Sequence, residues 1–289
     1  DVTSLKSGRR NLIINGGFDV WQRGTSFSSA EYTSDRWKAQ IQASAGTHTQ
    51  VSDAPSGFRY SLKETCTGTS SWFQVGQAVE YKNFAHLVGQ EVTLSFYAKA
   101  SFTGLTSRVR KATTEDASTV FSGTTVVSPT HTLTTSWARY TTTFTVPTDA
   151  KALTFEFSET GWSNGDTFQI TGVQLELGST ATDFEHRSYG EELALCQRYY
   201  YKNGDATNNK AASGSGYATG TGQSRAARFT TALPVSMRAS PTVTATLLEA
   251  GNVTIGTTYS SKNYMSWYPS SAASGSCYFA GYYSLDAEL

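Results

Sequence analysis

Large aromatic side chains in short polar segments are the residues of this sequence best suited to binding chemistry. Trp72 lies in GTSSWFQ, Trp162 lies in ETGWSNGD, and Tyr217 lies among Gly, Ser, Ala and Thr. A flat ring can cover the C–H face of a sugar, while nearby hydroxyl, amide and carboxylate groups bond the sugar hydroxyls. For each single ring the alternative is that it packs in the core or between subunits.

The densest aromatic cluster is the run YSSKNYMSWYP at residues 259–269. It places several rings beside an ammonium and an amide group, which suits a hydroxyl-rich ligand. The sequence therefore predicts carbohydrate-binding residues here and at the single aromatics: Trp72, Trp162, Tyr217, Tyr259, Lys262, Asn263, Tyr264, Trp267 and Tyr268.

Three carboxylates close together in sequence raise the possibility of glycan cleavage. That reaction needs two carboxyl groups roughly 5 to 9.5 Å apart, and the candidates are Glu156, Glu159 and Asp166. Glu156 alternates with two phenylalanines on a predicted strand, so it points away from the core, and a turn aspartate is usually structural. We therefore expect no catalytic residues and no enzyme.

Composition and spacing exclude several other classes of function. Lys+Arg and Asp+Glu are 23 each, so the net charge of +0 predicts neither nucleic acid nor an anionic membrane as a partner. No apolar run approaches the ~20 residues that cross a bilayer, which predicts no membrane insertion. The 3 cysteines and 4 histidines lack metal-ligand spacing, so we expect reduced thiols and no cofactor.

One segment, EHRSYGEELALCQRYYY at residues 185–201, has the pattern of a helix. Ser188 and Glu191 form a capping box at its start. Apolar residues then recur in two stripes, which predicts two packing partners. Burial within one chain is one alternative; the other is an interface between subunits, with the candidate residues Leu193, Leu195, Cys196, Tyr199 and Tyr200.

The rest of the chain has the pattern of β-structure. Residues 91–100 alternate between apolar and polar side chains, as a strand with one buried face does. Residues 167–177 change parity at Thr171–Gly172, which predicts a β-bulge. Residues 203–223 are mostly small and polar, which predicts a flexible loop or a segment ordered by a partner. Strand patterns recur on both sides of the helix at the spacing typical of β-sandwiches, which predicts an all-β protein with two domains.

Several runs of the sequence resemble a known family. In the first half these are NLIINGGFDVWQRG, YTSDRW, VTLSFYAKA, WARYTTTFTV and FQITGVQLELGSTATDFE. They resemble the jelly-roll sandwiches of carbohydrate-binding modules, in the variant found in tail fibres and receptor-binding proteins of tailed bacteriophages. The second half, with EHRSYGEELALCQRYYY, LPVSMRASPTVTA and YYSLDAEL, is similar to the C-terminal tip domain of those phage proteins. The resemblance covers nearly the whole chain and is most specific at residues 173–201.

The resemblance implies both an architecture and a role. It implies a jelly-roll domain at residues 1–187, and a linking α-helix with a smaller β-sandwich tip domain at residues 188–289. The expected protein is a homotrimeric tail fibre or spike on the exterior of the virion, which contacts other tail or capsid proteins. It would adsorb to the host by binding surface polysaccharide or lipopolysaccharide without cleaving it. A purely structural virion decoration or adaptor is the alternative, and a glycan depolymerase is a less favoured one.

Some carbohydrate-binding modules of this kind hold a structural calcium between an acid near the first strand and another near the last. Asp19 matches the first position, but Thr171–Gly172 stands where the second acid would be. The resemblance therefore leads us to expect no calcium in this chain.

Overall fold

The computed structural model describes residues 9–28, 31–42, 45–68, 72–117, 120–207, 210–223 and 227–288. The chain divides into two compact units, with the boundary between Glu192 and Leu193. Each unit is built from antiparallel β-sheets, so the predicted all-β class is confirmed.

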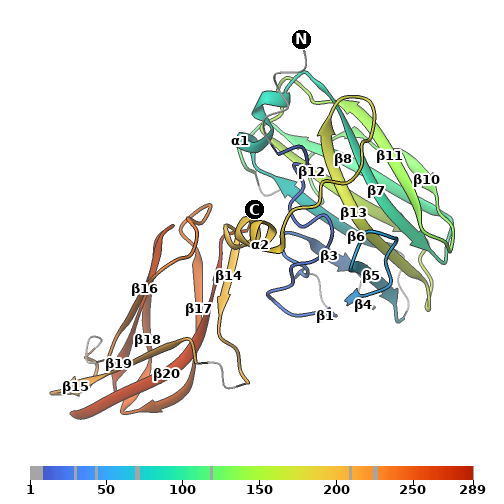
Figure 1. The fold of residues 1–289 in the computed structure, drawn as a ribbon. Helices are drawn as coiled ribbons and strands as arrows, with labels where there is room; N and C mark the ends of the chain where they lie inside the picture. The colour runs from blue at the N-terminus through green and yellow to red at the C-terminus, as the bar shows by residue number, and fades with distance from the viewer. Residues whose placement is uncertain are drawn as a thin grey trace. The chain divides into compact units, whose positions relative to one another are not determined.

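The first unit is a sandwich of two sheets (Figure 1). Sheet A has the strand order β1 (Ser26–Phe27), β4 (Gly46–Val51), β5 (Ser61–Cys66), β13 (Thr167–Leu177), β7 (Glu91–Ala100) and β11 (Ala138–Thr145). Sheet B has the order β10 (Thr130–Thr132), β8 (Gly104–Ala112), β12 (Ala152–Thr160), β6 (Trp72–Val79), β3 (Lys38–Ile41) and β2 (Glu31–Tyr32), and β9 (Thr124–Val127) also pairs with β8. The short helices α1 (Tyr81–Phe84) and η3 (Ala85–Leu87) connect β6 to β7.

Alternate side chains of the two sheets meet in one core. Phe96 of β7 packs edge-on against Phe157 of β12, with ring centroids 4.7 Å apart, so the two sheets face each other. Trp37 contacts the same Phe157 and stacks on Phe18 at 4.9 Å. Because side chains alternate along a strand, the residues between the core positions lie on the outer face of each sheet.

The predicted bulge in β13 is confirmed. Its register with β7 shifts between Thr171 and Gln174. Gly172 has φ +62, and a Cβ there would lie 2.6 Å from the Phe58 ring, so the position requires glycine. The shift sends Gln174 to the outer face, where its amide donates to the Asp183 carbonyl at 3.3 Å.

The helix α2 (Tyr189–Gln197) is shorter than predicted, and its start is as predicted. Glu191 N donates to Ser188 Oγ at 3.3 Å, and Ser188 N donates to the Glu191 carboxylate at 3.1 Å, which confirms the capping box. The helix ends before the tyrosine run because residues from Tyr200 pair with the last strand of the chain.

The second unit is a smaller sandwich with its own core. In sheet C, β20 (Gly275–Asp286) pairs with β14 (Tyr200–Asn203), β15 (Ala212–Ala218) and β17 (Thr242–Gly251). Sheet D has the order β16 (Phe229–Ala232), β19 (Tyr264–Ser271) and β18 (Val253–Ser260). Trp267 of β19 packs against Phe279 of β20, with centroids 4.9 Å apart, inside this core.

The prediction of a flexible loop over residues 203–223 is wrong for the part that forms β15. Backbone pairing with β20 orders this strand, so it needs few apolar side chains. Small residues are an advantage there, because a Cβ on Gly214 would lie 2.7 Å from the Phe279 ring. The strand is thus ordered by the chain itself.

Candidate functional site

Five polar and aromatic residues gather on the outer face of sheet B, and we call them the sheet B polar face: Gln40, Trp72, Gln74, Arg108 and Glu156. Phe73 and Val75 point into the core, so Trp72 and Gln74 beside them point outward. Gln40 of β3 lies opposite Gln74 of β6, and Arg108 of β8 lies opposite Glu156 of β12. The face therefore runs across four neighbouring strands.

Hydrogen bonds join four of these residues and Arg110 into one network: Gln40, Gln74, Glu156, Arg108 and Arg110. Gln40 Nε2 donates to Gln74 Oε1 at 2.6 Å, and Gln74 Nε2 donates to Glu156 Oε1 at 3.3 Å. Arg108 Nη1 donates to Glu156 Oε1 at 2.6 Å, and Arg110 Nε donates to Glu156 Oε2 at 2.9 Å. The bonds to the Glu156 carboxylate are charge-assisted. Together with the bond between the two amides, they hold the amide and guanidinium groups in position before any ligand arrives.

One end of the sheet B polar face is covered and the other carries an indole. A Cβ on Gly76 would meet the Phe121 ring at 3.0 Å and Val120 at 3.3 Å, so these two residues lie against the sheet there. Trp72, at the far end of β6 opposite Thr160, is half-buried and keeps part of its ring accessible. An indole beside amide, guanidinium and hydroxyl groups can bind a hydroxyl-rich ligand without chemical change.

Sequence reasoning found Trp72 but missed the three residues that complete this face. Gln40, Gln74 and Arg108 lie on three strands that are far apart in the chain. The alternation WFQVGQ within β6 marks Gln74 as outward. No local signal identifies β3 and β12 as the neighbours of β6, or β8 as the strand beyond β12. That information comes from the strand order.

Trp162 is not a surface ring, and its prediction as a sugar-binding residue is wrong. It is 2% exposed and packs against Phe73 with centroids 4.5 Å apart. Its Ser- and Gly-rich flanks form the turn before β13, and the indole fills the end of the core beneath that turn.

The three carboxylates weighed for glycan cleavage have separate environments. Both oxygens of Glu156 accept hydrogen bonds from arginines, at 2.6 and 2.9 Å. Asp166 accepts bonds from Ser101 Oγ at 2.8 Å and from Ser163 N at 2.9 Å, which close the turn before β13. Burial raises the pKa of Glu159, which lies on β12 beside Gly104 of β8.

The predicted cluster of residues 259–268 divides between the two sides of sheet D. Tyr259 and Tyr268 pack edge-to-face with centroids 5.4 Å apart, and Tyr264 shares the outward parity of Tyr268 on β19. Lys262 and Asn263 lie in the exposed turn between β18 and β19. Trp267 is fully buried and its Nε1 donates to the Ile255 carbonyl at 2.6 Å, so its prediction as a sugar-binding residue is wrong.

Tyr217 is the most exposed large ring in the described chain, at 68%. It lies on β15 opposite Ser276, on the outer face of sheet C. Tyr278 of β20 shares this face and is 54% exposed.

The candidate interface residues lie on α2 and directly after it, and they fall into two groups. Cys196, Tyr199 and Tyr200 are buried within the chain, which removes them as contacts to another subunit unless the chain opens. Leu193 and Leu195 are half-buried and keep some surface available.

The described ranges contain no group of three or more His, Cys, Asp or Glu side chains that could hold a metal ion. Burial raises the pKa of the Asp19 carboxyl, and the attraction of Arg59 and His186 offsets part of this rise. At the second position considered for a calcium site, the Thr171 hydroxyl donates a hydrogen bond to the Tyr60 carbonyl at 2.8 Å.

In the described part of the chain, no helix is both long and apolar enough to cross a bilayer.

No protein-family model and no curated protein matches this sequence. Among solved structures, the enzymatically active domain of bacteriophage CBA120 tailspike protein 4 is 17% identical, with a TM-score of 0.41; the match covers 58% of this chain and 21% of that one. TmCBM61 in complex with β-1,4-galactotriose is 16% identical with a TM-score of 0.40, covering 59% of this chain and 100% of that one. The CBM22-1 xylan-binding domain of Paenibacillus barcinonensis Xyn10C is 12% identical with a TM-score of 0.37, covering 61% and 100%. Likeness at this level assigns neither a family nor a ligand to this chain.

Proposed function

We propose that this protein binds a host surface glycan without cleaving it, as part of a bacteriophage appendage on the exterior of the virion. The observation that carries the binding proposal is the sheet B polar face, where an indole lies on one surface with two amides and a guanidinium that hydrogen bonds already hold in place. The phage role rests on the sequence resemblance, above all at residues 173–201.

The chemistry of the face favours binding over catalysis. A general acid or nucleophile needs a carboxyl oxygen that can reach the glycosidic bond. Both Glu156 oxygens are engaged by arginines, and Asp166 is engaged by its own turn. Of the three candidates only Glu159 then remains, and cleavage needs two carboxyl groups, so glycan cleavage is the weaker proposal.

Binding at one such site is expected to be weak. Dissociation constants between ~1 mM and ~1 µM correspond to only about −4 to −8 kcal/mol. A homotrimer, repeated on several appendages, would raise the apparent affinity when sites engage one surface together. This multivalency is why we include the homotrimer and its virion partners in the proposal.

The test is binding of the full chain to host cells and to a glycan array, with release of reducing ends followed in the same samples. We expect binding without release, and Trp72→Ala with Gln74→Ala should weaken it by about tenfold or more. Gln90→Ala, an exposed residue in the turn before β7, is the matched control and should bind as the wild type does.

Two results would overturn the proposal. Release of reducing ends would make the protein a depolymerase. Absence of binding to host cells and to every glycan would instead support the structural decoration or adaptor role.

A further inference from the structure

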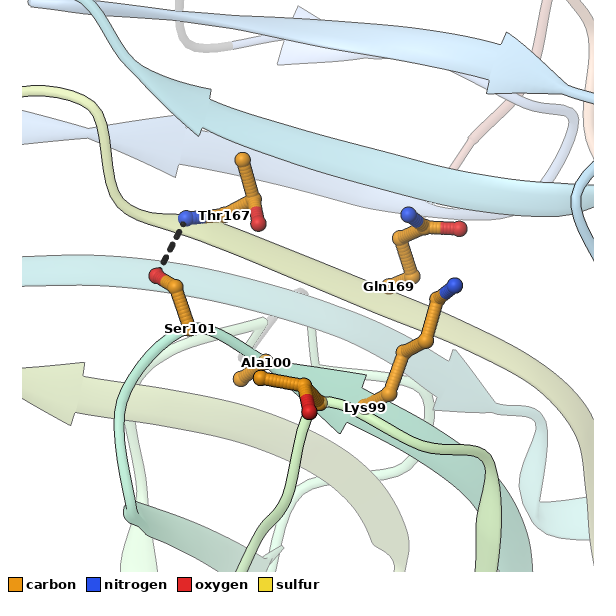
Figure 2. Close-up of a pocket in the computed structure, with 6 residues that line it drawn as sticks. Lys99, Ala100, Ser101, Thr167 and Gln169 are labelled. Atoms are coloured by element: carbon orange, nitrogen blue, oxygen red, sulfur yellow. Dashed lines mark hydrogen bonds between the residues drawn. The ribbon is translucent and has the colours of Figure 1, made fainter.

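A pocket of about 140 Å³ lies on the opposite side of the first unit, on the outer face of sheet A. It is lined by Lys99, Ala100, Ser101, Thr135, Thr167 and Gln169. Lys99 and Gln169 are cross-strand neighbours, and Figure 2 shows their side chains extending together at one end of this sheet A pocket. At the other end Ser101 Oγ accepts a hydrogen bond from Thr167 N at 3.0 Å (Figure 2).

The chain covers much of this outer face but leaves the pocket end open. Farther along β13, Gln174 and Glu176 bond residues 182 and 183 of the segment before α2. Ser101 and Thr135, at the pocket, are exposed. The pocket is thus a concave polar surface that this segment does not fill.

Asp53 and Trp137 extend the set of binding groups beside the pocket. Lys99 Nζ donates to Asp53 Oδ2 at 2.6 Å, and Trp137 Nε1 donates to Asp53 Oδ1 at 3.2 Å. Lys99 Nζ also lies 5.2 Å from the centroid of the Trp137 ring. The pKa of Asp53 lies below its ordinary value, mainly because Lys99 donates a hydrogen bond to the carboxylate. The ionised carboxylate is a hydrogen-bond acceptor at neutral pH.

These groups keep hydrogen-bonding capacity for a ligand. An ammonium has three N–H donors, and Asp53 is the hydrogen-bond partner that Lys99 has within the described residues. The Asp53 side chain is 52% exposed, so its carboxylate is accessible from solvent. The charges of the Asp53 carboxylate and the Lys99 ammonium cancel. An acceptor and a donor therefore lie side by side, with no net charge that would favour an anionic ligand.

We propose that the sheet A pocket, together with Asp53, is a second carbohydrate subsite that takes one neutral pyranose residue. Asp53 accepts a hydrogen bond from one hydroxyl of the sugar ring, and Lys99 donates to the adjacent hydroxyl. Hydrogen bonds to the remaining edge of the ring come from the Gln169 amide and from the hydroxyls of Thr135 and Thr167. The pocket is smaller than the ~300 Å³ of sites that enclose drug-sized ligands, so it takes a single residue at a chain end or branch. It uses the other sheet of the sandwich and so stands whether or not the sheet B polar face binds glycan.

The experiment is a protein-observed NMR titration of the full chain with the methyl α- and β-glycosides of glucose, galactose and mannose. We expect saturable shifts at the backbone amides of residues 99–101 and 167–169 with at least one of them. Lys99→Met should weaken this binding by about tenfold or more, the usual cost of losing a hydrogen bond from a charged group.

Lys111→Met is the matched control, because Lys111 forms the same kind of ion pair with Asp149 on sheet B. The side-chain exposures of that pair are 19% and 56%, against 18% and 52% for Lys99 and Asp53. The control should bind as the wild type does. The shifts are read at amides of sheet A, so they report this subsite separately from the sheet B polar face.

Three results would overturn the subsite. The first is no saturable shift at these amides with any of the glycosides. The second is equal weakening by Lys99→Met and Lys111→Met. The third is binding of methyl glucuronide alone, which would mean that the pocket selects an anion rather than a neutral sugar.

Discussion

Aromatic residues that are close together on β19 have opposite roles. Trp267 fills the core of the second unit, where its ring packs on Phe279 and its Nε1 donates to a backbone carbonyl. Tyr264, three residues earlier, points outward and is 47% exposed. The difference follows from the alternation of strand side chains, since 264 and 267 have opposite parity.

Alanine at these two positions should therefore separate stability from binding. Trp267→Ala should lower the free energy of unfolding by about 3–5 kcal/mol, because it leaves a large cavity in a small core. Tyr264→Ala should change the free energy of unfolding by no more than about 0.5 kcal/mol, as surface substitutions usually do. Urea denaturation measures both, and equal losses would show that Tyr264 is also a packing residue.

At the scale of elements, the segment before α2 is fastened to the start of the chain. Glu185 accepts hydrogen bonds from Arg10 N at 3.0 Å and from Asn11 N at 2.8 Å. Arg187 Nη1 donates to the Ile13 carbonyl at 3.1 Å and pairs with Glu192 at 3.2 Å. Burial raises the pKa of Glu185, but the two backbone N–H groups and Arg187 outweigh it and hold the pKa below its ordinary value.

This depressed pKa makes part of the stability depend on pH. The contribution of Glu185 is present above its unfolded pKa of about 4.3 and is lost as the pH falls through the lower folded value. Glu185→Gln should thus lower the free energy of unfolding at neutral pH and reduce its decline below about pH 4.3. Denaturation at a series of pH values measures this.

Glu91→Gln removes an exposed carboxylate at the start of β7 and is the control for a general loss of charge. If the free energy of unfolding falls equally steeply with decreasing pH in Glu185→Gln and in Glu91→Gln, the Glu185 contacts do not make the pH-dependent contribution that we describe.

For the whole molecule, exposed apolar surface is concentrated in the second unit. Of the six large hydrophobic side chains most exposed in the described residues, five belong to it: Tyr217, Ile255, Tyr259, Tyr264 and Tyr278. Exposed apolar side chains mark an interaction surface where they are contiguous, and Tyr217 and Tyr278 share the outer face of sheet C. They are the surfaces available for subunits or for the host in the proposed homotrimer.

Sedimentation of the purified chain tests the homotrimer. We expect a trimer at micromolar concentration, and Tyr217→Ser combined with Tyr278→Ser should shift it toward monomer if the outer face of sheet C lies between subunits. A wild-type monomer at that concentration would contradict the trimer. An unchanged trimer in the variant would leave this face available for glycan.

Local patterns in the sequence determined the all-β class, the bulge at Gly172, the capping box of Ser188 and Glu191, and the inward or outward direction of most strand residues. Each of these depends on a few consecutive residues, through parity, a glycine conformation or a first helical turn. The tertiary structure decided which strands are neighbours. That order brings Gln40, Gln74, Arg108 and Glu156 together, and Asp53 to Lys99 and Trp137. It also buried Trp162 and Trp267, because a ring in a polar segment is accessible only if no other part of the fold packs over it.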